Sequence, residues 1–182
     1  IAPLQDGPSL LGLPLSWKSL ALFYRKDLVS QPPKTTDEIM AIGERLRMSS
    51  AGSARRYGLV YEAGNFFKHA AILHGFGGAI IPSGSPVPTL DTPEQLRALG
   101  FVSTLVKQGS LPDEMSAVLV TQFFNEGRAA MTINGPWFIA EIAPNVPYGV
   151  APMPIVSETG KVAAPLTSIE AGFVSARSLH KQ

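Results

Sequence analysis

A chain of 182 residues is long enough for one substantial domain and too short for two large ones. Apolar residues make up 45% of it and charged residues 16%, which is the balance of a packed globular domain rather than of a disordered segment. The 15 basic and 14 acidic residues nearly cancel, so no nucleic-acid partner is expected, and the lack of cysteine excludes thiol catalysis, disulfides and thiolate metal sites.

The two ends of the sequence bear on what kind of chain this is. It starts at Ile1 without a visible signal peptide, and Leu179 to Gln182 looks like the start of another element. We therefore expect a fragment or a processed piece of a longer protein. No apolar run approaches the roughly 20 residues of a membrane helix. The absence of cysteine fits an oxidising compartment.

The first expected elements are two short strands and a helix. Pro14 forbids a helix through the first dense apolar segment, so two strands that meet near Trp17 and Lys18 fit better. Thr35, with Glu38 three residues later, forms a capping box, in which each side chain satisfies a free backbone N–H at the start of a helix.

The later elements alternate between strands and helices. In chain order we expect a strand at 57–61, helices at 66–73, 92–108 and 116–126, and strands at 129–133, 148–153 and 166–175. The helix at 92–108 opens with Thr92 as its cap and Gln95 as the reciprocal partner. Such alternation predicts an α/β domain with a mostly parallel sheet and helices on both faces.

One segment is specific enough to point to a family. Residues 124–137, FNEGRAAMTINGPW, resemble the maltose- and maltodextrin-binding proteins, within the large family of extracellular solute-binding proteins that serve ABC importers. Three other parts agree with this family in the same order: 13–29 with 32–39, then 58–78, then 148–154 with 170–175. The resemblance implies sugar binding for uptake, with an oligosaccharide such as maltose and the permease subunits as partners. It also implies a periplasmic or extracellular location, membrane association through the transporter, no cofactor and no catalysis.

The resemblance also implies a division of the chain, because members of the family have two α/β lobes between which the chain crosses. Residues 1–16 would be a hinge strand region of the first lobe, 17–167 the second lobe with the sugar-binding face, and 168–182 the return strand into the first lobe. The hinge strands at 11–16 and 169–175 should lie adjacent. Without their partners from the first lobe they would expose open strand edges, through which we expect self-association.

Aromatic side chains are the first candidates for the binding site, since sugar rings stack on flat apolar surfaces. Trp137 follows the turn at Asn134 and Gly135, and we expect it to stack on a sugar, a core tryptophan being the alternative. Phe66 and Phe67 match the aromatic pair of the family's ligand loop. Each is either ligand-facing or core, and Phe66 matches the stacking position.

The polar candidates depart from the maltose-binding pattern. Gly64 and Asn65 stand where the family has a glutamate and a proline, and Glu62 replaces that carboxylate only if the loop is re-routed. Lys18, preceded by Trp17, matches a glutamate. A lysine only donates hydrogen bonds, so Lys18 indicates either a different, anionic or modified sugar, or a solvated lysine beside a core tryptophan.

Other functions stay open at this point. A glycosidase would also bind sugars with aromatics, but it needs two carboxylates facing one cleft, and no such pair stands out. A solute-binding protein for a non-maltose solute and a purely structural domain are further alternatives. We expect His69, His74 and His180 to be helix-surface residues, because their spacing does not suit a metal site.

Overall fold

A computed structural model describes residues 4–50, 54–81, 84 and 87–179, so His180 lies outside the described residues. Contacts divide the chain into two compact units. Unit 1 comprises Ile1–Ser19 and Thr167–Gln182, and unit 2 comprises Leu20–Leu166. Among the described residues, no helix is long and apolar enough to cross a membrane.

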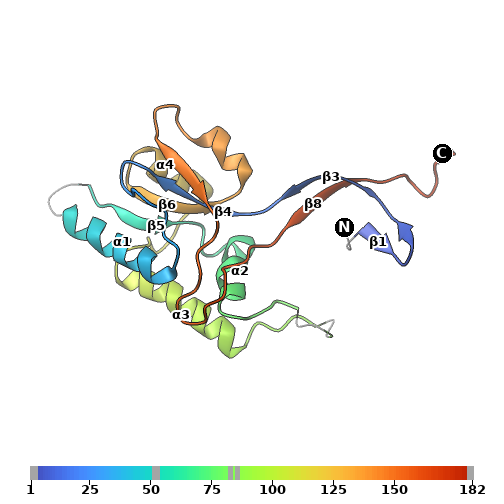
Figure 1. Cartoon of the computed structure of the whole chain (residues 1–182), viewed down its shortest axis with the longest axis horizontal. Coiled ribbons are helices and arrows are strands. Elements are labelled where there is room, and N and C mark those ends of the chain that lie inside the picture. The colour runs from blue at the N-terminus through green and yellow to red at the C-terminus, as the bar shows by residue number, and fades with distance from the viewer. Residues whose placement is uncertain (1–3, 51–53, 82–83, 85–86, 180–182) are drawn as a thin grey trace. The chain divides into compact units, whose positions relative to one another are not determined.

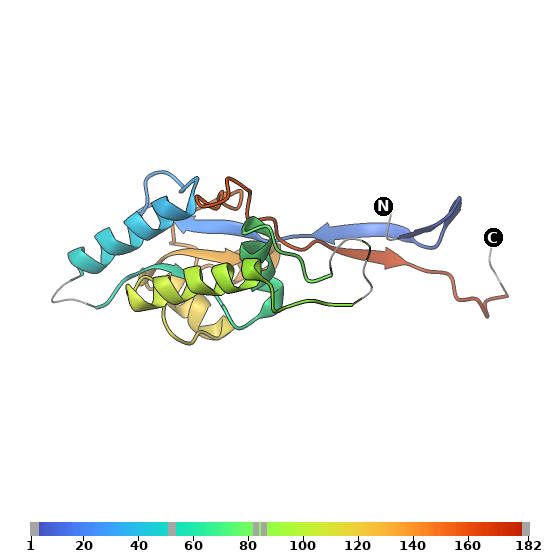
Figure 2. The same ribbon diagram turned by 90° about the horizontal axis from the view of Figure 1, so that it is seen from below.

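Unit 1 consists of paired strands. Strand β3 (Leu13–Lys18) runs antiparallel to β8 (Ser168–Gly172), with Trp17 opposite Ile169 and a register shift between Pro14 and Ser16. Figures 1 and 2 show the two strands side by side, although about 150 residues separate them in the sequence. A short pair, β1 (Gln5–Asp6) with β2 (Ser9–Leu10), precedes them. The expected adjacency of the two hinge strands is confirmed.

Unit 2 is built on a four-stranded sheet in the order β5-β6-β4-β7. Its strands are β4 (Ala21–Arg25), β5 (Tyr57–Val60), β6 (Ala129–Asn134) and β7 (Tyr148–Ala151). Strand β5 is parallel to β6, but β4 is antiparallel to both of its neighbours. The expected mostly parallel sheet is therefore wrong. Strand β4 is inserted between β6 and β7 and runs against both, so two of the three pairings in this sheet are antiparallel.

Helices cover both faces of this sheet, as expected (Figure 1). The larger core contains side chains of α1 (Thr36–Ser49), α2 (Phe66–Gly75) and α3 (Pro93–Lys107). The opposite face packs against α4 (Ala117–Asn125) and the 3₁₀ helix η2 (Pro136–Glu141). Successive residues of β4 alternate between them, because Leu22 belongs to the first core and Phe23 to the second.

Both predicted caps form, but neither reciprocal bond does. Thr35 accepts the N–H of Glu38, while the Glu38 carboxylate accepts the N–H of Lys34 at 2.7 Å rather than that of Thr35. Thr92 accepts the N–H of Gln95. The Gln95 side chain, however, is buried, with its Nε2 atom 3.4 Å from Nε2 of His69.

The expectation that His69 lies on the helix surface is therefore wrong, since only 3% of this residue is exposed. It lies on the face of α2 that packs against α3, and burial lowers the pKa of its imidazole because the charged form is poorly solvated there. His74, one and a half turns further along α2, is partly exposed, with Nδ1 2.6 Å from the carbonyl of Ala164.

Candidate functional site

One edge of the unit 2 sheet collects the carboxyl ends of β5, β6 and β7 and the amino end of β4. Ala21, the first residue of β4, pairs with Asn134, the last residue of β6, and Leu22 pairs with Ala151, the last residue of β7. Because β5 is parallel to β6, its carboxyl end also lies at this edge. Open α/β sheets bind ligands beyond the carboxyl ends of their strands. This edge is therefore the candidate site.

Trp137 reaches this edge immediately after β6. The side chain of Asn134 accepts the N–H of Gly135 at 3.0 Å, and Pro136 then opens the 3₁₀ helix with its fixed backbone angle. The next residue, Phe138, is fully buried between the rings of Phe23 and Phe124, at centroid distances of 5.2 and 5.3 Å. This anchor fixes the segment, while 43% of Trp137 stays exposed.

The two phenylalanines at the start of α2 have different environments. Asn65 caps the helix by accepting the N–H of Phe67 at 3.1 Å. Phe67 is half-buried and packs against the main core, whereas Phe66 is exposed and meets the edge of the His69 ring at a centroid distance of 6.5 Å. Of the pair, Phe66 is thus the one free to meet a ligand.

Glu62 lies in the loop that precedes this helix, and its side chain is held by an ion pair. Its carboxylate forms an ion pair with Lys68, a residue that is only 5% exposed. Because a buried ammonium without a counter-ion is costly, this pair holds Glu62 toward α2. Whether Glu62 replaces the missing glutamate at the ligand stays a prediction, and Lys68 is its partner in this structure.

Unit 1 has a pocket of about 420 Å³, and one of several pockets in unit 2, with a volume of about 440 Å³, lies at the candidate edge. It opens between the loop after β5 and the segment before α4, with lining residues Ala63, Gly64, Asp113, Glu114, Met115 and Leu119. Tyr61 also lines it; its buried hydroxyl has no partner among the described residues, and burial raises the pKa of this phenol. The pocket combines an apolar wall with two exposed carboxylates that can accept hydrogen bonds.

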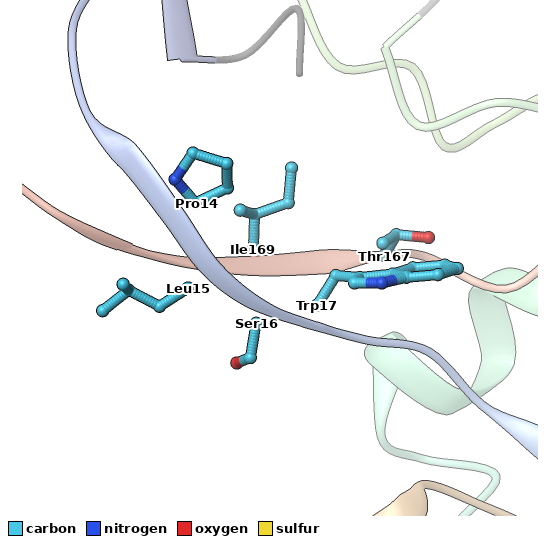
Figure 3. Close-up of a pocket in the computed structure, with 6 residues that line it drawn as sticks. All are labelled: Pro14, Leu15, Ser16, Trp17, Thr167 and Ile169. Carbon is cyan, nitrogen blue, oxygen red and sulfur yellow. The ribbon is translucent and has the colours of Figure 1, made fainter.

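The remaining sequence candidates, Trp17 and Lys18, belong to unit 1. Trp17 is 76% exposed and lines the unit 1 pocket together with Thr167 and Ile169 (Figure 3). The alternative of a core tryptophan is therefore wrong for Trp17. Lys18 forms an ion pair with Glu170 of the neighbouring strand, which also accepts a hydrogen bond from Ser16 at 2.8 Å.

The structure thus brings Trp137 and the loop bearing Phe66 to one edge of unit 2. Proximity of Lys18 to these residues stays a prediction. Three residues of the candidate surfaces were missed from the sequence: Asp113, Glu114 and Glu170. The first two stand just before the cap of α4, where acidic residues are ordinary, and Glu170 is identified only by its strand register with Ser16.

Comparisons with known proteins identify relatives of this chain. A family model described as a bacterial extracellular solute-binding protein matches residues 1–182. A maltotriose-binding protein of Pyrococcus abyssi is 32% identical over 152 residues, which cover 82% of this chain and 32% of that protein. A maltodextrin-binding protein of Bacillus subtilis is 28% identical over 158 residues, covering 82% and 38%.

A solved structure is similar over nearly the whole chain. It is that of a cyclo/maltodextrin-binding protein complexed with maltotetraose, with a TM-score of 0.81 and 30% sequence identity. The match covers 97% of this chain and 46% of the other. The chain therefore spans less than half the length of each of these three relatives.

Proposed function

Because the chain belongs to the family of bacterial extracellular solute-binding proteins, we propose that it binds an oligosaccharide of the maltodextrin type for uptake by an ABC importer. The observation that carries this proposal is the exposed indole of Trp137, fixed by the buried Phe138 at the carboxyl edge of the sheet. An aromatic ring held there offers a flat apolar surface to a pyranose ring.

The polar contacts of the proposed site come from the neighbouring pocket in unit 2. Sugar hydroxyls both donate and accept hydrogen bonds, and carboxylates are strong acceptors. Asp113 and Glu114 line the pocket between Gly64 and Met115, so they are in place to accept from hydroxyls. Phe66 adds a second exposed ring near this loop. In unit 1, Trp17 and Lys18 are the residues that we propose to face ligand.

The proposal extends to the protein's surroundings and organisation. We propose a periplasmic or extracellular location and delivery of the sugar to the permease subunits of an ABC transporter. Residues 17–167 would form the sugar-binding lobe, with 1–16 and 168–182 as hinge strands of another lobe. The compact units, with boundaries at Leu20 and Leu166, support this division to within three residues.

We propose binding without catalysis, since the matching family and relatives are binding proteins. An assay for hydrolysis tests this proposal, because a glycosidase also uses two carboxylates and the pocket contains Asp113 and Glu114. Incubation with chromogenic maltosides should release no product above a buffer blank. Product release that is lost in Asp113→Asn or Glu114→Gln would replace the binding proposal with a hydrolytic one.

The direct test is a titration that reports on Trp137 alone. The chain has two tryptophans, so Trp17→Phe leaves Trp137 as the only one. We expect maltotriose to change its fluorescence saturably, at about millimolar concentration, because one lobe supplies about half of a typical −8 kcal/mol binding energy. Sorbitol, a polyol without a pyranose ring, is the control. Identical traces for the two compounds would argue against sugar stacking at this edge.

A further inference from the structure

Lys18 is not a free cation. Strands β3 and β8 place it diagonally opposite Glu170, whose carboxylate receives the Lys18 ammonium on one oxygen and the Ser16 hydroxyl on the other. In Figure 3, Ser16 points away from the side of the strands that carries Pro14 and Ile169. Because Ser16 and Lys18 donate to the same carboxylate, the ion pair lies on the face of the two strands toward which Ser16 points.

The charge of this pair is balanced at neutral pH. The hydrogen bond from Lys18, followed by that from Ser16, holds the pKa of the Glu170 carboxyl below its ordinary value, so the carboxylate is ionised. A lysine with no counter-ion would attract an anionic ligand, whereas a lysine beside a carboxylate presents a donor and an acceptor with no net charge. Such an arrangement suits neighbouring hydroxyls of a neutral sugar.

Unit 2 disfavours anions independently of unit 1. The ammonium of Lys68 is taken by Glu62, and the pocket beside them adds Asp113 and Glu114. A sugar carboxylate entering this pocket would meet two like charges. In unit 1, a single residue, Glu170, removes the attraction that Lys18 alone would exert on an acidic sugar.

We propose that Glu170 is a specificity-determining residue: by pairing with Lys18 it makes the chain select neutral over anionic oligosaccharides. This inference rests on the proposed function, in which Lys18 faces ligand. It also argues against the interpretation of Lys18 as the mark of an acidic sugar, since the charge of this lysine is already compensated.

The effect should be modest and sensitive to salt. The side chains of Lys18 and Glu170 are 39% and 58% exposed, and charges in contact with water are strongly screened. We expect Glu170→Gln to improve binding of an anionic sugar relative to a neutral one by about threefold to tenfold at low salt. The improvement should shrink at about 1 M salt, where the screening length is about 3 Å.

The experiment titrates the whole chain with two matched sugars and follows backbone amide shifts by NMR, which suits weak binding. The sugars are maltotriose and the derivative in which one terminal CH₂OH is oxidised to a carboxylate. The expected result is a lower ratio of the two dissociation constants, anionic over neutral, in Glu170→Gln than in the wild type. Adding Lys18→Met to that variant should return the ratio to its wild-type value, because the lysine that lost its counter-ion is then removed as well.

Glu44→Gln is the matched control, because it breaks another exposed ion pair, with Arg47 on α1. An equal ratio in Glu170→Gln and Glu44→Gln, with maltotriose still bound, would overturn this inference and leave the proposed function standing. No binding of maltotriose by the wild type would overturn both. NMR titration of the Glu170 carboxyl adds a readout that needs no ligand: its pKa should rise in Lys18→Met, and an unchanged value would show that the pair does not form.

Discussion

The indole ring of Trp137 lies directly over Gly135. A Cβ atom added at Gly135 would come within 2.2 Å of Cη2 of the ring, far below any normal contact. The backbone of Gly135 has φ −97°, which every residue can adopt, so only the ring opposes a side chain there. We expect Gly135→Ala to displace the indole and to weaken maltotriose binding about tenfold, the loss of an aromatic contact of about 1.4 kcal/mol.

The control for that prediction is Gly100→Ala on α3, outside the lining of the candidate pocket, where an added Cβ meets nothing within 4 Å. Fluorescence titrations with maltotriose, in the Trp17→Phe background that leaves Trp137 as the reporter, should show weaker binding for Gly135→Ala than for the control variant. Equal sugar affinities for the two would mean that the ring position is unimportant for binding.

Removing the ring altogether should have a larger effect. We expect Trp137→Ala to reduce sugar affinity several-fold to a thousand-fold, about 1–4 kcal/mol, with little change in the free energy of unfolding because the exposed ring adds little to the core. Ile139→Ala truncates another exposed apolar residue of η2 and serves as the control. Calorimetry in which the two variants bind equally well would assign Trp137 a structural role.

The buried His69 predicts a pH dependence of stability. Burial lowers the pKa of His69 in the folded chain, and its Nδ1 has no partner among the described residues. The unfolded chain therefore binds a proton more readily. The stabilisation is fully present above the unfolded pKa of about 6.5 and is lost as the pH falls through the lowered folded value.

Urea unfolding of wild type and His69→Gln at about pH 7.5 and about pH 5.5 would measure this. The wild type should lose more stability between these values than the variant does. His74→Gln, on the same helix but partly exposed, should behave as the wild type. A variant with the full wild-type loss would place the titrating group elsewhere.

Arg25 predicts a large stability effect from a charged residue. It is 8% exposed, and its Nη1 donates to the carbonyls of Phe124 and Asn125 at 2.7 and 3.0 Å, where helix α4 ends. On the other side of the guanidinium, Nη2 of Arg25 forms an ion pair with Oδ2 of Asp27 at 2.7 Å. We expect Arg25→Met to cost about 2–4 kcal/mol of unfolding free energy, because the buried carbonyl of Phe124 and the partly buried carbonyl of Asn125 lose a charged donor. Arg47→Met, which breaks an exposed pair, should leave the unfolding free energy nearly unchanged in the same denaturation assay.

The paired strands of unit 1 predict self-association. Leu13, Leu15 and Trp17 are 62%, 70% and 76% exposed on β3, and this sheet has two strands in the described part of the chain. Such strands recruit further chains. Light scattering should detect dimers or larger species that Leu15→Lys reduces. Val118→Lys, at a 75% exposed site on α4, should leave them unchanged, and a wild-type chain that stays monomeric at high concentration would refute the expectation.

The parts of this fold that could be predicted from the sequence are those fixed by neighbours in the chain. The caps at Thr35 and Thr92 and the turn into Trp137 depend on residues within three or four positions. The direction of β4 was missed because it depends on which strands flank it, and nothing local records that.

The candidate surfaces show the same limit. The aromatic candidates could be found because the family resemblance marks them individually. The partner of Lys18 could not, because Glu170 follows it by 152 residues and meets it only through strand register. The contact of His69 with Gln95 was missed for a related reason, since a good capping pattern at Thr92 offered the glutamine a different partner.

Strand β6 has a consequence for the way a ligand meets the edge of unit 2. All six of its residues are buried, and it is paired with β5 on one side and β4 on the other. The backbone leading to Trp137 can thus fray only if the sheet opens, so its conformational entropy is already lost when the chain folds. A sugar that stacks on this ring does not have to order it, and the attraction between the two appears almost undiminished in the binding free energy.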